Sequence, residues 1–192
     1  EDGIRDLVRS RGLGDVYKRQ VNTMCESLAD DLEALTEGRV FLRILSNLAD
    51  RSIVKTKVEI DTNELKGKGY RGDEVRDGII LASQLAEIDP YRAATHNKGI
   101  MNAISAVAIA CGQDWRAIES GAHSFAAHGR EYGSLTKWSK DDNGNLIGSI
   151  ELPMAVGLVG GAVRVHPAAQ ANVEILGIET ADELAKVTRS SG

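Results

Sequence analysis

The 192-residue chain has few of the residues that mark secreted, metal-binding or membrane proteins. Its two cysteines, Cys25 and Cys111, lie far apart without CxxC spacing, which is typical of small buried side chains in a reducing compartment. Its four histidines lack metal-ligand spacing, which argues against a zinc site. No apolar run approaches the length that crosses a bilayer. These absences favour a cytoplasmic protein with no metal and no membrane contact.

Positive charge and aromatic residues are also scarce. The chain carries 23 Lys and Arg against 28 Asp and Glu, a net charge of −5. A nucleic-acid surface needs clustered positive charge, so this balance argues against one. An RNA-binding sheet in residues 21–88 would also need exposed aromatic residues, and only Phe41 and Tyr70 are available there. We therefore expect no nucleic-acid partner.

Residues 1–20 do not resemble natural protein sequence. Residues 1–6 (E-D-G-I-R-D) and 15–20 (D-V-Y-K-R-Q) match the translation of common DNA-sequencing adapters. The segment also lacks the apolar stretch of a secretory signal. We therefore predict that residues 1–20 are a non-native, adapter-derived tail and that the natural sequence starts in mid-gene at Val21.

Residues 21–88 alternate between helical and extended periodicity. The expected elements are a helix over residues 21–35 ended by Gly38, strands over residues 39–46 and 53–60, and a helix over residues 75–86. Helix, strand, strand and helix form the middle of a split β-α-β-β-α-β, or ferredoxin-like, sandwich whose opening strand is missing. An independent small α+β module is the alternative.

Asp89-Pro90 interrupts the pattern and is the expected boundary before a second unit, residues 89–192. The expected elements of this unit are a helix with its apolar stripe at 100–111, a helix capped by Asp114, a hairpin of residues 135–140 and 145–152, a helix over 167–176 and a last helix with a Thr180/Glu183 capping box. The fold class is therefore α+β.

Residues 92–102 (R-A-A-T-H-N-K-G-I-M-N) are the most informative stretch for function. They place Lys98 near the start of an apolar helix, and Asp114 stands at the start of the next helix. Backbone N–H groups converge at helix starts, so this region could bind an anionic, oxygen-rich substrate. On chemistry alone, an exposed lysine with no catalytic role is the commoner interpretation.

The sequence around these residues resembles that of a known protein family. Residues 89–102 (D-P-Y-R-A-A-T-H-N-K-G-I-M-N) and 112–123 (G-Q-D-W-R-A-I-E-S-G-A-H) closely resemble the class II, bacterial-type 3-hydroxy-3-methylglutaryl-CoA (HMG-CoA) reductases, and residues 43–50 and 151–162 agree as well. The resemblance implies a ferredoxin-like cofactor domain inserted into a larger α+β substrate domain. Residues 21–88 would then be part of the NAD(P)-binding domain, and residues 89–192 part of the substrate-binding, catalytic domain.

The resemblance also implies an activity. Such enzymes reduce HMG-CoA to mevalonate and coenzyme A with two hydrides from NADH or NADPH, or run the reverse reaction. They assemble as dimers that share the active site between subunits. We therefore expect NAD(H) or NADP(H) as cofactor, HMG-CoA, mevalonate and coenzyme A as ligands, and a homodimer or higher homo-oligomer.

Roles for individual residues follow from the same resemblance. Lys98 matches the catalytic lysine, whose ammonium would stabilise the oxyanion formed on the thioester carbonyl. Asp114 matches the catalytic aspartate, which would keep Lys98 charged and help to relay protons. Arg92 resembles the contact to the substrate carboxylate, Asn102 a polar group of the same cleft, and Asn47 an asparagine near the nicotinamide. The alternatives are a solvated lysine, a helix cap, a surface ion pair and a turn-forming asparagine.

Some features of the family are not present in these residues. The family uses a glutamate in its N-terminal part and a histidine in a C-terminal flap, and its D-A-M-G cofactor motif would lie just before Val21. We therefore expect the 192-residue chain to be inactive by itself. A non-catalytic module that binds acyl-CoA or a nucleotide is the alternative.

Overall fold

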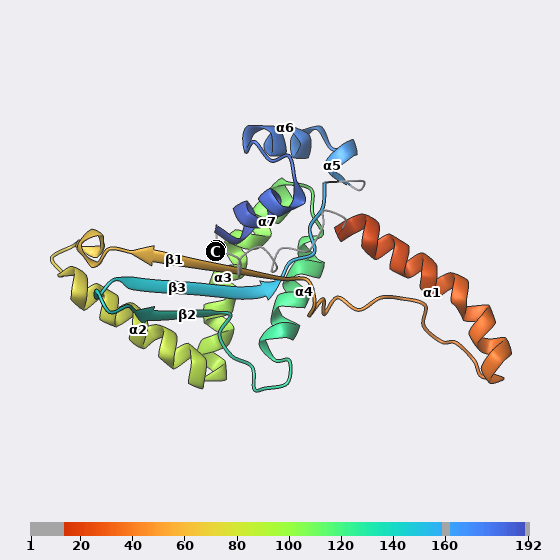
Figure 1. Cartoon of the computed structure of the whole chain (residues 1–192), viewed down its shortest axis with the longest axis horizontal. Helices are drawn as coiled ribbons and strands as arrows, with labels where there is room; N and C mark the ends of the chain where they lie inside the picture. The colour runs from red at the N-terminus through yellow and green to blue at the C-terminus, as the bar shows by residue number, and fades with distance from the viewer. Residues whose placement is uncertain (1–13, 159–161, 191–192) are drawn as a thin grey trace.

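A computed structural model describes residues 14–158 and 162–190 of the chain (Figure 1). Along the chain, helices are interspersed with the strands of a small antiparallel sheet, which confirms the α+β class. No helix in these ranges is long and apolar enough to cross a membrane. The elements are α1 (Gly14–Thr36), β1 (Ile53–Ile60), η1 (Thr62–Leu65), α2 (Gly72–Ile88), α3 (Pro90–Ala110), α4 (Trp115–Ala126), β2 (Thr136–Lys140), β3 (Leu146–Pro153), α5 (Ala162–Val165), α6 (Pro167–Ile175) and α7 (Ala181–Ser190).

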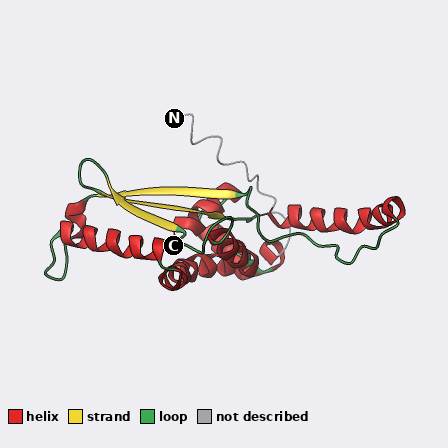
Figure 2. Cartoon of the chain, turned by 90° about the horizontal axis from the view of Figure 1, so that it is seen from below, coloured by secondary structure: helices red, strands yellow, loops and turns green. Residues whose placement is uncertain are grey.

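The sheet has the strand order β1-β3-β2, and both pairings are antiparallel. Val54 lies opposite Leu152, and Thr136 lies opposite Ile150. These four side chains are buried, whereas Lys137, the residue after Thr136 on β2, is exposed. Successive side chains of a strand point to opposite faces. Figure 2 shows the sheet over a layer of helices, so its apolar face meets the core. The predicted strand over residues 53–60 and the predicted hairpin are both confirmed.

Helix α3 forms the centre of the helical layer and contacts α2, α4 and α7. Asp89 caps it by accepting a hydrogen bond from the Tyr91 N–H (3.0 Å), and Pro90 occupies the first turn, where no N–H is needed. The helix therefore starts before its apolar stripe. Its buried side chains join those of α4, α7, β1 and β3 in one core; the α3 members are Ile100, Met101, Ile104 and Ala108.

The prediction of a strand over residues 39–46 was wrong, because this segment forms no sheet ladder among the described residues. It runs back along α1 and is held by side chains of that helix. The Glu33 carboxylate accepts the Val40 N–H (2.7 Å), and the Asn22 amide oxygen accepts the Leu45 N–H (2.9 Å). Strand-forming residues become a strand only when another strand takes up their backbone hydrogen bonds.

Helix α1 and its returning segment project away from the sheet (Figure 1). The strand and helix that follow, β1 and α2, instead share the sheet and core of residues 89–192: β1 pairs with β3, and α2 contacts α3 and β2. The described sheet thus crosses the expected boundary between residues 88 and 89. Helix α1 also begins at Gly14, inside the predicted tail, while residues 1–13 lie outside the described ranges.

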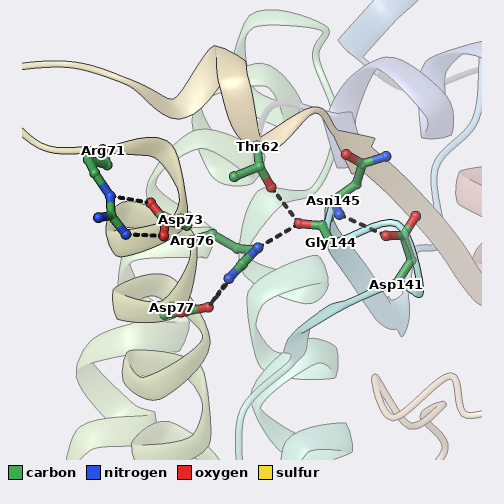
Figure 3. Close-up of polar contacts among 8 residues, drawn as sticks. All are labelled: Thr62, Arg71, Asp73, Arg76, Asp77, Asp141, Gly144 and Asn145. Atoms are coloured by element: carbon green, nitrogen blue, oxygen red, sulfur yellow. Dashed lines mark hydrogen bonds and ion pairs between the residues drawn. The ribbon is translucent and has the colours of Figure 1, made fainter.

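A polar junction holds the β2–β3 turn against η1 and α2 (Figure 3). The Gly144 carbonyl accepts hydrogen bonds from the Thr62 hydroxyl (2.5 Å) and from Arg76 Nη1 (2.8 Å). Asp141 closes the turn by accepting the Asn145 N–H (2.7 Å). Gly144 has a φ of 84°, a conformation that favours glycine, as the predicted Asn-Gly turn requires. The junction fixes one end of the sheet to α2.

The C-terminal helices largely follow the sequence pattern. Helix α6 begins at Pro167, as predicted. The predicted capping box is confirmed, because the Glu183 carboxylate accepts the Thr180 N–H (2.9 Å) while the Thr180 hydroxyl accepts the Glu183 N–H (3.2 Å). Residues 157–161 (G-L-V-G-G) are glycine-rich, and residues 159–161 lie outside the described ranges.

Gly148 on β3 provides a test of the sheet packing. A Cβ at this position would lie 2.6 Å from Cζ3 of Trp138 on the neighbouring strand. We expect Gly148→Ala to lower the free energy of unfolding by about 1–3 kcal/mol, because the indole has to move. Urea denaturation of the 192-residue chain measures the change.

Gly78→Ala is the matched control, since a Cβ at Gly78 on α2 would meet nothing within 4 Å. It should raise the free energy of unfolding by roughly 0.5–1 kcal/mol, through helix propensity alone. Equal effects of the two substitutions would contradict the described packing of Trp138.

Candidate active site

The outward face of α3 carries two of the predicted site residues. Lys98 and Asn102 are one turn apart and both are exposed. Tyr91 and Ile109 lie on the same face at spacings of about two helical turns, and they are 88% and 56% exposed. The structure thus groups an ammonium and a carboxamide between two exposed apolar side chains.

Arg92 belongs to a different face of α3. It is half-buried and lies about 120° around the helix from Lys98. His96, one turn later, is close enough for the charge of Arg92 to act on its imidazole. Arg92 is therefore beside the Lys98 face, and its guanidinium forms no ion pair with another described residue.

Asp114 lies at the far end of α3, where the chain turns into α4. Its carboxylate caps α4 by accepting the Ala117 N–H (3.1 Å), as the sequence predicted. The turn is set by Gly112, whose φ is 66°, and by a hydrogen bond from the Gln113 N–H to the Ala108 carbonyl (2.8 Å). Asp114 is exposed and keeps one carboxylate oxygen free of contacts with described residues.

The chain does not bring Lys98 and Asp114 together. No hydrogen bond or ion pair joins them within residues 14–158 and 162–190. Lys98 lies about 15 Å along the α3 axis from Ala108, beside which the turn to Asp114 is tied. This separation exceeds the reach of a lysine side chain, so the two residues do not meet in the described structure.

Asn47 lies in the segment between α1 and β1, close to α4. A Cβ at Gly121 of α4 would lie 2.8 Å from the Asn47 carbonyl oxygen, so the two backbones touch there. The Asn47 side chain is exposed and makes no hydrogen bond to another described residue. The structure thus places this carboxamide beside α4, apart from the outward face of α3.

Two buried carboxamides were missed in the sequence. Asn97 is 0% exposed and Gln113 is 9% exposed. Each makes three hydrogen bonds with its side chain. Their position directly before Lys98 and Asp114 was visible in the sequence, but helical periodicity gives no sign of which polar residues become buried.

The histidines on α3 and α4 are half-buried and hydrogen-bonded within the fold. His96 Nε2 lies 2.6 Å from the Thr136 hydroxyl, and His123 Nδ1 lies 2.8 Å from the Tyr132 hydroxyl. No group of three or more metal-ligating side chains occurs among the described residues. A cavity of about 350 Å³ lies between the end of α4 and the outer face of the sheet, near Arg130 and Lys137, and none of the predicted site residues lines it.

Comparison with solved structures identifies the fold. The chain superimposes on a class II 3-hydroxy-3-methylglutaryl-CoA reductase from Streptococcus pneumoniae bound to NADPH in open conformations, with a TM-score of 0.86 and 41% identity over 94% of this chain and 44% of that one. A second structure of that reductase from the same organism gives a TM-score of 0.84 and 42% identity, over 90% of this chain and 41% of that one.

Sequence comparison gives the same family. The model of hydroxymethylglutaryl-coenzyme A reductase matches residues 20–192. A 3-hydroxy-3-methylglutaryl-coenzyme A reductase of Archaeoglobus fulgidus is 52% identical over 90% of this chain, and a probable one of Borreliella burgdorferi is 30% identical over 85%. The chain therefore belongs to the hydroxymethylglutaryl-coenzyme A reductase family. It spans 38% of the length of each of these two relatives.

His96 should make the free energy of unfolding depend on pH. Burial, and then the charge of Arg92, lower the pKa of His96, so the folded chain favours the neutral imidazole. The unfolded chain binds the proton more readily, so the free energy of unfolding should fall as pH falls through about 6.5, the ordinary pKa of histidine. Urea denaturation between about pH 7.5 and pH 5 should show this decline, and it should be smaller in His96→Gln. An identical decline in the variant would contradict the assignment.

Proposed function

We propose that the protein to which this chain belongs reduces HMG-CoA to mevalonate and coenzyme A with NADH or NADPH. Family membership supports the reaction, and the observation that carries the assignment to a site is the exposed Lys98 on the outward face of α3. A lysine held on a rigid helix, with its ammonium free of carboxylates from the described residues, is suited to a substrate oxygen.

Reduction of a thioester to an alcohol consumes two hydrides and two protons and releases the thiol. Two molecules of NADH or NADPH, bound one after the other, would supply one hydride each. Lys98 would stabilise the oxyanion that develops on the thioester carbonyl, because its positive charge offsets the negative charge that forms there. Asp114 keeps Lys98 protonated and provides a route for the proton that the oxygen takes up.

Arg92 and Asn102 have the chemistry to bind the rest of the acyl group. The planar guanidinium of Arg92 matches a carboxylate with two parallel hydrogen bonds, so it binds the free carboxylate of HMG. Asn102, one turn after Lys98, offers a donor and an acceptor to a substrate hydroxyl or carbonyl. Both residues project from α3, Asn102 from the Lys98 face and Arg92 from the face beside it, so one helix would present all three groups to the acyl chain.

The described residues fit a nicotinamide only in part. The exposed carboxamide of Asn47 has its donor and acceptor free of described residues and can pair with the carboxamide of the nicotinamide ring. We assign no other described residue to the dinucleotide. The chain alone thus leaves the choice between NADH and NADPH open.

We also infer that the protein forms a homodimer in which Lys98 of one copy meets Asp114 of the other. The separation of these residues along α3 supports this arrangement. The exposed Tyr91 and Ile109 on either side of Lys98 support it too, because a partner copy seated on this face would remove their apolar surface from water. A twofold axis would make the contact reciprocal and give two equal sites.

Lys98→Ala in the full-length enzyme tests the oxyanion role. We expect kcat to fall by at least about 100-fold, with the Kd of HMG-CoA changed less than about threefold, because the lost interaction belongs to the transition state. NAD(P)H oxidation and calorimetric binding measure the two effects. Lys140→Ala, at an exposed lysine at the end of β2, is the control and should leave both values unchanged. Equal losses of binding and turnover would overturn the role given to Lys98.

The isolated chain provides a second test. The purified 192-residue chain should show no NAD(P)H oxidation with HMG-CoA, because it spans only 38% of the length of its relatives and offers the dinucleotide one assigned contact, Asn47. The complete reading frame from the same gene should restore turnover. Measurable turnover by the chain alone, abolished by Lys98→Ala, would show that these residues are sufficient for catalysis.

A further inference from the structure

Each of the two candidate catalytic residues directly follows a buried carboxamide. Asn97 precedes Lys98, and Gln113 precedes Asp114. Burying a primary amide is costly unless its donor and acceptor atoms are hydrogen-bonded. Both side chains satisfy this requirement with bonds to other parts of the fold, so their placement is strongly constrained.

Asn97 fastens α3 to the segment that leads into β2. Its Oδ1 accepts the Leu135 N–H (2.9 Å), and its Nδ2 donates to the Gly133 carbonyl (2.9 Å). These two bonds act in opposite directions on one short stretch of backbone, so they resist both sliding and rotation of the helix. His96 adds a contact to the same strand through Thr136.

The same amide reaches α4 through Tyr132. Asn97 Nδ2 donates to the Tyr132 hydroxyl (3.0 Å), which leaves the hydroxyl proton for His123 Nδ1 on α4 (2.8 Å). The rings of His123 and Tyr132 stack with their planes 22° apart. Asn97 thus links α3, α4 and the start of β2, and it does so one residue before Lys98.

Gln113 fastens the α3–α4 turn to the segment after β3. Its Oε1 accepts the Gly157 N–H (2.9 Å), and its Nε2 donates to the Gly157 carbonyl (2.9 Å) and to the Cys111 carbonyl (3.0 Å). The side chain thereby pairs with Gly157 as a neighbouring strand would. Asp114 follows at once as the cap of α4.

We propose that Asn97 and Gln113 are positioning residues, which hold Lys98 and Asp114 in the directions that catalysis requires. This proposal rests on the proposed function. Because each α-helical residue turns by about 100°, a small rotation of α3 at Asn97 moves the Lys98 ammonium across the outward face. A misplacement of about 1 Å at a reacting centre can cost about 100-fold in rate.

Asn97→Ala and Gln113→Ala in the full-length enzyme test the proposal, with Ser83→Ala as the matched control. Ser83 on α2 is 1% exposed, and its hydroxyl accepts the backbone N–H of Trp138 on β2 (3.2 Å). This contact lies away from both catalytic residues. All three variants should have lower Tm. At a temperature where all are folded, the two amide variants should lose about 10- to 100-fold in kcat with KM changed less than about threefold, whereas Ser83→Ala keeps its kcat. Losses of kcat no larger than that of Ser83→Ala would overturn the proposal.

A double variant separates positioning from general damage. On the Lys98→Ala background, Asn97→Ala should lower the remaining kcat by less than about twofold, because no ammonium is left to misplace. The same fold loss as in the wild-type background would overturn the proposal.

Hydrogen exchange decides the same question without turnover. In Asn97→Ala, the Leu135 amide and the amides of α3 around Lys98 should exchange faster, while those of α2 keep the wild-type rates. Unchanged exchange around Lys98 would overturn the positioning role. Failure of the wild-type enzyme to reduce HMG-CoA would instead count against the proposed function, and the exchange result would still test the clamp.

Discussion

The burial of one face of α3 is the constraint on which the rest of the structure depends. Ile100, Ile104 and Ala108 join side chains of α4 and the sheet in a single core, so the helix has one favourable rotation about its axis. The opposite face, with Lys98 and Asn102, is then directed outward. Apolar packing chooses the face, and the hydrogen bonds of Asn97 fix it more closely. The chemistry of the site follows from the hydrophobic pattern of a single helix.

This arrangement separates stability from reactivity. Groups that pack α3 are hydrogen-bonded inside the fold, His96 through Nε2 and Asn97 through both Oδ1 and Nδ2. Lys98 instead forms no ion pair with the described part of its own chain, so its charge remains available to a substrate. The distance between Lys98 and Asp114 also follows from the rigidity of α3. A helix that is rigid enough to orient each residue also keeps them apart, which is why we propose that a second copy completes the site.

The sequence predicted the elements whose partners are local. The alternation of residues 53–60, the Asn-Gly turn and the Thr180/Glu183 box each contain their own geometric cause, and the structure confirms them. Residues 39–46 failed because their strand identity depended on a distant ladder partner, and side chains of α1 took up their N–H groups instead. Asn97 and Gln113 could not be recognised as buried clamps, since their hydrogen-bond partners lie in segments far along the chain. The residue types of the candidate site could be recognised in the sequence, whereas the distances between these residues could not be predicted from it.

The most direct test of this account mixes two inactive variants of the full-length enzyme, Lys98→Ala and Asp114→Ala. The variants are unfolded together, refolded as random dimers and assayed for NAD(P)H oxidation with HMG-CoA. If Lys98 and Asp114 meet across two copies, half of the dimers regain one intact site, and activity returns to about a quarter of the wild-type value. If the mixture stays as inactive as each variant alone, the two residues act within one chain, and the account of α3 given above is wrong.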